Sequence, residues 1–307
     1  MNNIKFDWND ISIVPAVLSD ISSRKDVDPY YNDNTWGYNM LPLFTAPMDM
    51  VVNKLNHYDF TKNLINVCLP RNVVYDEVMN NTHFYSYGLD EIIEMFNTRD
   101  HLPCRILIDT ANASMIKLFN ISKAIKDKFG DNVELMIGNI ANPDTYRKYC
   151  EIGVDYCRVG VGAGSMCTTS ANVSIHYPMA SLIYECHQIS KEFKTPSKII
   201  ADGGFKNYSD IIKALGLGAN AVMLGGIFNK ALESCSDNYL LKIVGNEIEY
   251  CKTDSSNARN SFNDGADVYK YYRGMSTKEV QRDWNKKNIT TSEGIVKYNK
   301  VEYTLST

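Results

Sequence analysis

The chain has 307 residues, of which 44% are hydrophobic and 22% are charged, a composition typical of a soluble globular protein with a sizeable core. Its formal net charge of −4 gives it no basic surface of the kind that binds nucleic acid. No apolar run approaches the roughly 20 residues needed to cross a bilayer, so we expect no membrane segment.

The eight cysteines include no C-x-x-C pair and no metal-ligand spacing with histidine. In a chain of this length, that pattern argues against a disulfide scaffold and against structural zinc. The N-terminus also lacks the apolar stretch of a secretory signal. We therefore expect the protein in the reducing environment of the cytoplasm.

Short runs of β-branched and apolar residues recur along the chain, and most are followed by an amphipathic stretch. The predicted strands are Leu41–Met48, Ile65–Leu69, His83–Tyr87, Cys104–Thr110, Val133–Asn139, Tyr156–Gly162, Lys198–Asp202 and Ala221–Leu224. The amphipathic stretches include Met115–Lys128, Pro143–Ile152, Ala180–Phe193 and Asp210–Leu217. Eight apolar strands alternating with helices favour an α/β fold, a closed parallel (β/α)8 or TIM barrel, over an open doubly wound sheet.

Two segments fall outside this repeat. Residues 1–40 precede the first strand, and we expect them to cover the bottom of the barrel. Residues 229–307 are polar, with a hairpin-like pattern at Leu241–Tyr250 and no strong helix run. This segment is too long for a simple connection, so we predict a C-terminal flap or subdomain within a single domain that spans 1–307.

Glycine pairs follow the last two predicted strands. Asp202-Gly203-Gly204 follows the seventh strand and Gly225-Gly226 follows the eighth. TIM barrels often bind phosphate with these two loops, because backbone N–H groups there can approach the phosphate oxygens. Either pair alone could simply turn a strand into a helix, but both together favour a phosphate site. Asp202 is then either a helix N-cap or a ligand for a sugar diol, and we favour the diol.

The loop after the sixth strand carries the most specific local signal. Glycines precede Ser165 and Cys167 there, in the run Gly162–Thr169. A thiol on a glycine-rich loop at a barrel mouth is a candidate nucleophile, whereas the other seven cysteines are better read as small buried apolar residues. A hydroxyl two positions further on, at Thr169, could position or relay a proton.

Taken together, these motifs resemble those of the IMP dehydrogenase/GMP reductase family, in the family's order and almost from end to end. The motifs that carry the resemblance are Phe6-Asp7, Ala46-Pro47-Met48-Asp49, Asp109-Thr110-Ala111-Asn112, Gly138-Asn139, Gly162–Thr169, Asp202-Gly203-Gly204, Met223–Gly226 and Tyr272–Ser276. The resemblance implies the family's barrel, without an inserted CBS pair, and a loop cysteine that bonds to purine C2.

The resemblance also implies roles for individual residues. Cys167 would be the nucleophile, while Thr169 and Glu293 would handle the proton for the leaving amine. The residues implied to bind the substrate, a purine nucleotide (GMP or IMP), are Ser165, Asp202, Gly203, Gly204, Gly225, Gly226, Tyr272, Arg273, Gly274, Met275 and Ser276. Those implied to lie near the cofactor are Asp109, Ala111, Asn112 and Ser292. A monovalent cation such as K+ would lie at Gly162, Gly164 and Cys167, and the family implies a homotetramer.

Three features resemble the reductase branch, which expels ammonia and takes a hydride from NADPH. The stretch Thr277–Ser292 has no Arg-Tyr pair, which the dehydrogenase branch uses as its base, and Gly225-Gly226 and Met275-Ser276 have the reductase form. We therefore predict an NADPH-dependent GMP reductase that converts GMP to IMP and ammonia.

Three alternatives stay open: an IMP dehydrogenase (IMP to XMP with NAD), a catalytically impaired nucleotide-binding homologue, and turnover of an unusual purine nucleotide. The departures that motivate them include Ala113, where the family usually has Gly, and Thr290, where reductases often have Arg.

Overall fold

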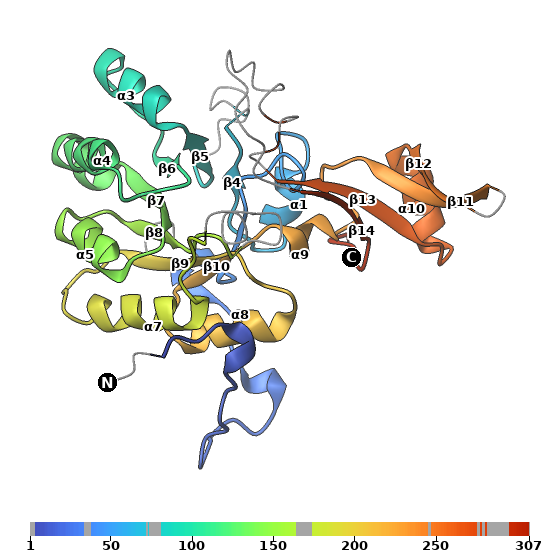
Figure 1. Ribbon diagram of the computed structural model, residues 1–307, viewed down its shortest axis with the longest axis horizontal. Coiled ribbons are helices and arrows are strands. Elements are labelled where there is room, and N and C mark those ends of the chain that lie inside the picture. Colours follow the sequence, from blue (N-terminus) through green and yellow to red (C-terminus); the bar gives the residue numbers. More distant parts are fainter. Residues whose placement is uncertain are drawn as a thin grey trace.

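A closed barrel of eight parallel strands forms the centre of the protein (Figure 1). The computed structural model describes residues 4–33, 38–71, 73, 81–163, 174–244, 247–274, 277, 280 and 295–306. The barrel strands are β3 (Leu43–Thr45), β4 (Cys68–Leu69), β5 (Phe84–Tyr87), β6 (Arg105–Asp109), β7 (Glu134–Ile140), β8 (Tyr156–Val159), β9 (Lys198–Asp202) and β10 (Ala221–Leu224). They are ordered β3-β10-β9-β8-β7-β6-β5-β4. The N–H of Thr45 donates to the carbonyl of Asn66, which joins β3 to the segment before β4 and closes the sheet. The predicted TIM barrel is confirmed, and each predicted strand overlaps an observed one.

Helices cover the outer surface of the barrel. They are α1 (His57–Thr61), α3 (Leu89–Thr98), α4 (Ile116–Phe129), α5 (Pro143–Glu151), α7 (Met179–Ser190), α8 (Tyr208–Gly216) and α9 (Gly226–Asn229). In Figure 1, α3, α4, α5 and α7 lie one below another along one side of the strands. Side-chain caps fix the starts of α5 and α8: the Asn142 side chain accepts from the N–H of Asp144, and Asn207 forms a capping box with Asp210. Among the described residues, no helix has both the length and the apolar character needed to span a bilayer.

Alternate strand residues build two apolar layers. In β6, Leu107 faces the interior of the barrel with Phe84 and Met136, whereas Ile106 and Ile108 pack on the side of the helices. This alternation is the period-2 pattern of a strand, and both faces are apolar because helices cover the outer one. It also determines which residues reach the mouth of the barrel.

The N-terminal segment contains η1 (Trp8–Asp10), η2 (Arg24–Asp26) and a hairpin of β1 (Tyr31–Asp33) and β2 (Tyr38–Met40). Trp8 is 3% exposed and stacks on Phe205, just after β9. The Asp7 carboxylate accepts the N–H of Met179 at the start of α7. Both contacts lie at the end of the barrel where strands finish, so the prediction that this segment lies beneath the barrel is wrong for Asp7 and Trp8. Trp8 finds its apolar cover at the loop after β9.

The C-terminal segment forms a second sheet, which projects from the barrel in Figure 1. Its strands are β11 (Asn238–Val244), β12 (Glu247–Thr253), β13 (Val268–Arg273) and β14 (Val296–Lys300), all antiparallel, in the order β12-β11-β13-β14. Leu241 pairs with Tyr250, as the hairpin pattern predicts. The sequence shows no strong helix run here, yet a nine-residue helix, α10 (Ser255–Asn263), packs against β11 and β13. It buries only Ala258, so its sequence shows almost no apolar stripe.

Candidate active site

Three charged side chains meet at the mouth of the barrel. Asp109 ends β6, Asp202 ends β9, and Arg158 lies in β8 between them. Arg158 Nη1 donates to Asp109 Oδ1 at 2.6 Å, and Arg158 Nη2 donates to Asp202 Oδ2 at 2.8 Å. Strand alternation explains the meeting, because each of the three lies two residues after a side chain of the barrel interior: Leu107, Tyr156 and Ile200. The Arg158 side chain is only 8% exposed.

Asp202 keeps one carboxylate oxygen available. Its Oδ2 accepts from Arg158 and from Asn139 Nδ2 at 2.6 Å. Its Oδ1 has no hydrogen-bond partner among the described residues, and the side chain is 15% exposed. The N-cap of α8 is Asn207, so Asp202 does not serve as the cap. A free carboxylate oxygen at a barrel mouth can accept hydrogen bonds from a sugar diol.

Asp109 is held as a carboxylate. Burial opposes its ionisation, but the charges of Arg158 and Arg71 outweigh burial and keep the pKa of Asp109 below its usual value. Arg71 Nε donates to Asp109 Oδ2 at 3.3 Å, and a second Arg71 nitrogen donates to the Asp109 carbonyl. Asp109 is therefore a fixed negative charge beside the loop that follows β6.

That loop exposes Ala111 and Asn112 and anchors the residue after them. Ala113 is buried, its N–H donates to the carbonyl of Asn139, and its carbonyl accepts from the Tyr149 hydroxyl. Asn112 Oδ1 accepts the N–H of Ser114, which leaves the Asn112 side-chain NH2 without a partner among the described residues. The loop thus presents an exposed amide donor next to Asp109.

Tyr272 brings the C-terminal sheet to the same mouth. It lies in β13 and is 3% exposed. A Cβ added at Gly225 would stand 2.7 Å from the Tyr272 hydroxyl oxygen and 3.0 Å from Met48 Sδ, so these groups are in close contact. Burial, together with the charge of Asp202, raises the pKa of Tyr272 above its usual value. Its hydroxyl therefore stays protonated; it donates to Met48 Sδ at 3.5 Å, a weak acceptor that an anion could replace.

The other glycines and Arg273 shape the surroundings. Gly203 and Gly204 have φ of +91° and +81°, values that other residues rarely adopt, and Gly162 has φ of +74°. Gly226 begins α9, and the N–H of Gly274 donates to the carbonyl of Ile295. Arg273 Nη2 donates to Asp49 Oδ2 at 2.8 Å, which ties β13 to the loop after β3. Arg273 is therefore engaged in holding the sheet against the barrel.

Several predicted site residues lie outside the described residues. They are Gly164, Ser165, Cys167, Thr169, Met275, Ser276, Ser292 and Glu293. The structure brings together the described members in two groups, Asp109 with Asp202 through Arg158, and Gly225 with Tyr272. No sequence motif indicated a role for Arg158, Asn139 or Arg71. An arginine inside an apolar strand was the available signal, because a buried cation needs carboxylates at the same level of the barrel.

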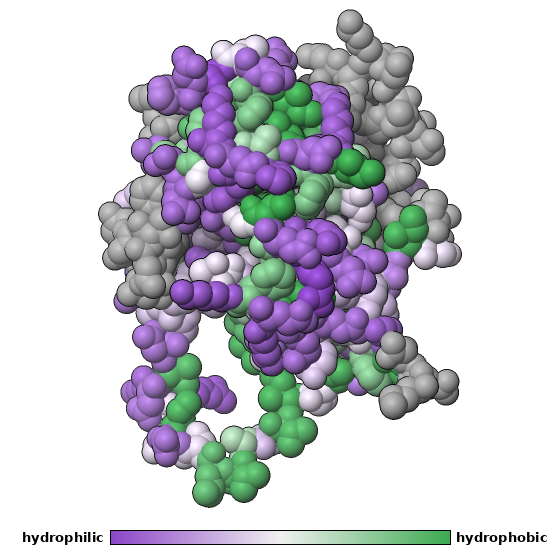
Figure 2. All heavy atoms as spheres, turned by 90° about the vertical axis from the view of Figure 1, so that its left-hand side faces the viewer, coloured by the Kyte–Doolittle hydropathy of each residue, from purple (hydrophilic) through white to green (hydrophobic). Residues whose placement is uncertain are grey.

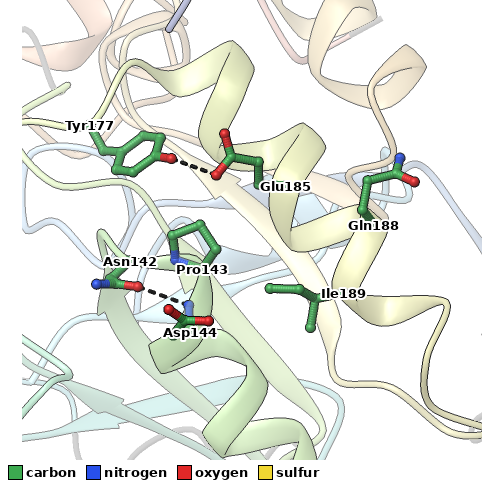
Figure 3. A pocket seen from close by; sticks show the side chains of 7 residues that line it. All are labelled: Asn142, Pro143, Asp144, Tyr177, Glu185, Gln188 and Ile189. Atoms are coloured by element: carbon green, nitrogen blue, oxygen red, sulfur yellow. Dashed lines mark hydrogen bonds between the residues drawn. The ribbon is translucent and has the colours of Figure 1, made fainter. Parts of the chain in front are cut away.

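A separate cleft of about 460 Å³ lies on the outside of the barrel, between the start of α5 and α7 (Figure 3). Tyr177 donates there to Glu185 at 2.5 Å, and Lys5 pairs with the same carboxylate. None of the predicted site residues that the structure describes lines this cleft. The strand ends, and not this cleft, carry the residues with recognisable chemistry.

The sequence of this chain is similar to those of known proteins. The model of the IMP dehydrogenase / GMP reductase domain matches residues 104–303. Inosine-5'-monophosphate dehydrogenase of Cryptosporidium parvum is 32% identical over 172 residues, which are 56% of this chain and 36% of that protein. The enzyme of the same name from Chlorobaculum parvum is 36% identical over 135 residues (44% and 27%), and that from Streptococcus pyogenes is 41% identical over 124 residues (40% and 24%). The chain thus spans about a third or less of the length of these curated relatives. Because the family model covers most of the barrel and the second sheet, the chain belongs to the IMP dehydrogenase/GMP reductase domain family.

Proposed function

We propose that the protein is an NADPH-dependent GMP reductase, which converts GMP to IMP and ammonia. The observation that carries the proposal is the composition of Thr277–Ser292, which contains no tyrosine and only one arginine, Arg282, followed by Asp283. The dehydrogenase branch uses an Arg-Tyr pair as the base that activates water. Without that base, hydrolysis of a purine adduct loses its activator, and reduction becomes the better second step.

The described residues support a nucleotide at the barrel mouth. Asp202 Oδ1 is available for the ribose hydroxyls, and the protonated Tyr272 hydroxyl beside Gly225 can donate to the phosphate. Gly203 and Gly204 bring backbone close to the same anion. Ser165, Met275 and Ser276 complete the proposed contacts to phosphate and base.

The proposed chemistry begins with the thiolate of Cys167, which adds to purine C2. The exocyclic amine then leaves as ammonia after it has received a proton from the pair Thr169 and Glu293. A bound NADPH would supply the hydride that C2 accepts. The carbon–sulfur bond then breaks, and the sulfur leaves as a thiolate, so Cys167 is regenerated. The balance is GMP, NADPH and two protons in, and IMP, ammonium and NADP+ out.

The residues at the mouth fit a nicotinamide cofactor. The exposed NH2 of Asn112 is a donor for a carboxamide oxygen, and the backbone at Ala111 lies open beside it. Asp109 supplies a fixed negative charge near a ring that is positive in its oxidised form. We assign the cofactor to these residues and to Ser292. A monovalent cation, K+, is assigned to Gly162, Gly164 and Cys167.

The first alternative is an IMP dehydrogenase, which the names of the similar proteins favour. The second is a nucleotide-binding homologue without turnover. Product analysis separates all three: the purified protein is supplied with GMP and NADPH, or with IMP and NAD. The reductase consumes NADPH with GMP and releases ammonia, and Cys167→Ser abolishes this. Formation of XMP from IMP and NAD would reject the reductase proposal. If GMP raises the melting temperature and no product forms from either pair, the reductase and the dehydrogenase are both rejected, and the homologue without turnover or turnover of another purine nucleotide is left.

We also propose a homotetramer. The segment between η1 and η2 projects from the body and carries apolar side chains, visible at the lower edge of Figure 2. Val14, Val17 and Leu18 are 85%, 98% and 90% exposed. Apolar side chains gathered in this way are typical of protein contacts. Light scattering should give four times the mass of one chain, and Val17→Asp with Leu18→Asp should lower it. The described cysteines are all free thiols, which suits a reducing compartment such as the cytoplasm.

A further inference from the structure

Arg158 joins the two carboxylates that end β6 and β9. Its Nη1 donates to Asp109 at 2.6 Å, and its Nη2 and Nε donate to Asp202 at 2.8 Å and 3.3 Å. A guanidinium is planar and its donors have a fixed arrangement, so two carboxylates bound to one guanidinium are fixed relative to each other. Lysine, with a single nitrogen on a flexible chain, cannot do this.

Neighbouring groups hold the rest of the network. Arg71 donates to the other oxygen of Asp109, and Asn139 donates to Asp202 Oδ2. A Cβ added at Gly138 would stand 2.3 Å from Arg158 Cβ, so Arg158 packs directly on the backbone of β7. Of the four oxygens of the two carboxylates, only Asp202 Oδ1 has no partner among the described residues. A ligand that binds at that oxygen therefore contacts a carboxylate whose position is already fixed by its hydrogen bonds.

The network is largely buried. The side chains of Arg158, Asp202 and Asp109 are 8%, 15% and 21% exposed. Charges in such a site are poorly screened by water, so each ion pair responds to a change in the other. A hydrogen bond to Asp202 that moves this carboxylate, or draws its charge away from Arg158, changes the position of Arg158 and its attraction to Asp109.

We propose that Arg158 is a positioning residue that couples the nucleotide subsite at Asp202 to the cofactor subsite at Asp109. The inference rests on the proposed function, which assigns the ribose hydroxyls to Asp202 and the nicotinamide to Asp109. A diol bound at Asp202 Oδ1 fixes Asp202, which fixes the guanidinium and through it Asp109. Nucleotide binding thus preorganises the cofactor subsite, and by linkage the cofactor strengthens nucleotide binding by the same factor, of about 5- to 150-fold.

Binding calorimetry on the Cys167→Ala protein tests this without turnover. The dissociation constant of GMP is measured with and without saturating NADP+, and that of IMP with and without saturating NAD. For each nucleotide, the dissociation constant without the cofactor divided by that with the cofactor is the coupling factor. Arg158→Lys keeps the positive charge and removes the separate nitrogens that donate to Asp109 and Asp202. We expect both ligands to bind about 10-fold more weakly and the coupling factor to fall to about 1. Arg71→Lys is the matched control, because Arg71 contacts Asp109 and leaves the two hydrogen-bonding nitrogens of Arg158 in place; the coupling factor should therefore persist in this variant.

A loss confined to one ligand, or an unchanged coupling factor in Arg158→Lys, overturns the inference. If Arg158→Lys fails to fold, Asp109→Asn and Asp202→Asn are combined. Nucleotide affinities that are non-additive by about 3-fold or more support coupling, and additive losses overturn it. Failure to bind either nucleotide rejects the proposed function together with this inference. If the wild-type protein forms XMP and Arg158→Lys abolishes the coupling, only the reductase proposal is rejected. If the wild-type protein releases ammonia from GMP and the coupling persists in Arg158→Lys, only the role of Arg158 is rejected.

Discussion

The Tyr272 hydroxyl lies against the backbone of Gly225, so close that a Cβ at Gly225 would stand 2.7 Å from the hydroxyl oxygen. Gly225 has φ of −101°, which alanine adopts without strain, so this contact decides the effect of a substitution. We predict that Gly225→Ala pushes Tyr272 away from the mouth. It should weaken GMP binding by about 10-fold and lower the free energy of unfolding by about 1–3 kcal/mol, as overpacking does. Calorimetry and urea unfolding measure the two effects.

Gly216→Ala is the control for a glycine outside the site. A Cβ there meets Ile13 Cδ1 at 3.7 Å, an ordinary contact, and Gly216 is the last residue of α8. Its stability should stay the same or rise by up to about 1 kcal/mol, because alanine favours helix. Tyr272→Phe removes the clashing oxygen, so combined with Gly225→Ala it should recover part of the lost stability. No recovery would show that the clash is elsewhere.

Asp202 should determine whether the protein prefers a ribonucleotide. Its free Oδ1 is placed to accept from sugar hydroxyls, so the wild-type protein should bind GMP about 10-fold or more tightly than 2'-deoxy-GMP. In Asp202→Asn, an amide replaces the carboxylate and the preference should shrink to about 2-fold. Competition binding with the two nucleotides measures this ratio. A preference that survives Asp202→Asn would place the diol elsewhere.

Much of the barrel was predictable because its signal is repeated. Runs such as that of β6 are apolar on both faces, which is typical of strands that helices cover. Eight such strands in one chain favour a (β/α)8 barrel over other folds. Asp202 could be proposed for the site because it ends such a strand, whereas Asp109, which ends another, was proposed from the resemblance to the family. Arg158 was missed, because its role depends on three strands meeting in space and no single strand shows it.

The N-terminal segment and α10 could not be placed from the sequence for different reasons. Trp8 is a single buried aromatic residue in a polar stretch, and its partner Phe205 lies about two-thirds of the chain away. The helix α10 buries only Ala258, too little for an amphipathic pattern. Contacts that join distant segments through one side chain leave no periodic signal for sequence reasoning to detect.

Lys270 should make stability depend on alkaline pH. It is 1% exposed, its ammonium donates to the carbonyls of Ser234 and Ser236, and burial lowers its pKa to about 8. Between pH 8 and the usual value near 10.5, the unfolded chain binds more protons, so this group's penalty on stability is relieved as pH rises. The stability of wild type relative to Lys270→Met should rise by about 2 kcal/mol from pH 7 to about pH 9.5. Urea unfolding at both pH values tests this, with the exposed Lys242→Met as control; a constant difference would contradict it.

Glu233 binds the last described residues of the chain and should make the free energy of unfolding depend on pH in the acidic range. Its carboxylate accepts from the Thr304 hydroxyl at 2.5 Å, the Leu305 N–H at 2.7 Å, the Ser306 hydroxyl at 2.8 Å and Arg259 Nη2 at 3.1 Å. Burial opposes ionisation, but these hydrogen bonds outweigh it and lower the pKa of Glu233 to about 2. Glu233→Gln should therefore lower the free energy of unfolding by about 2–3 kcal/mol at pH 7.

Because the folded-state pKa of Glu233 lies below its unfolded value, its contribution is present above about pH 4.5 and is lost as the pH falls toward 2. The difference between wild type and Glu233→Gln should therefore shrink between pH 5 and about pH 3. Glu302→Gln is the matched control, since Glu302 pairs with Lys230 at the surface and is 49% exposed. Such a pair contributes less than about 1 kcal/mol, so this variant should stay close to wild type at every pH. Equal losses in the two variants would mean that the carboxylate of Glu233 gains nothing from its buried hydrogen bonds.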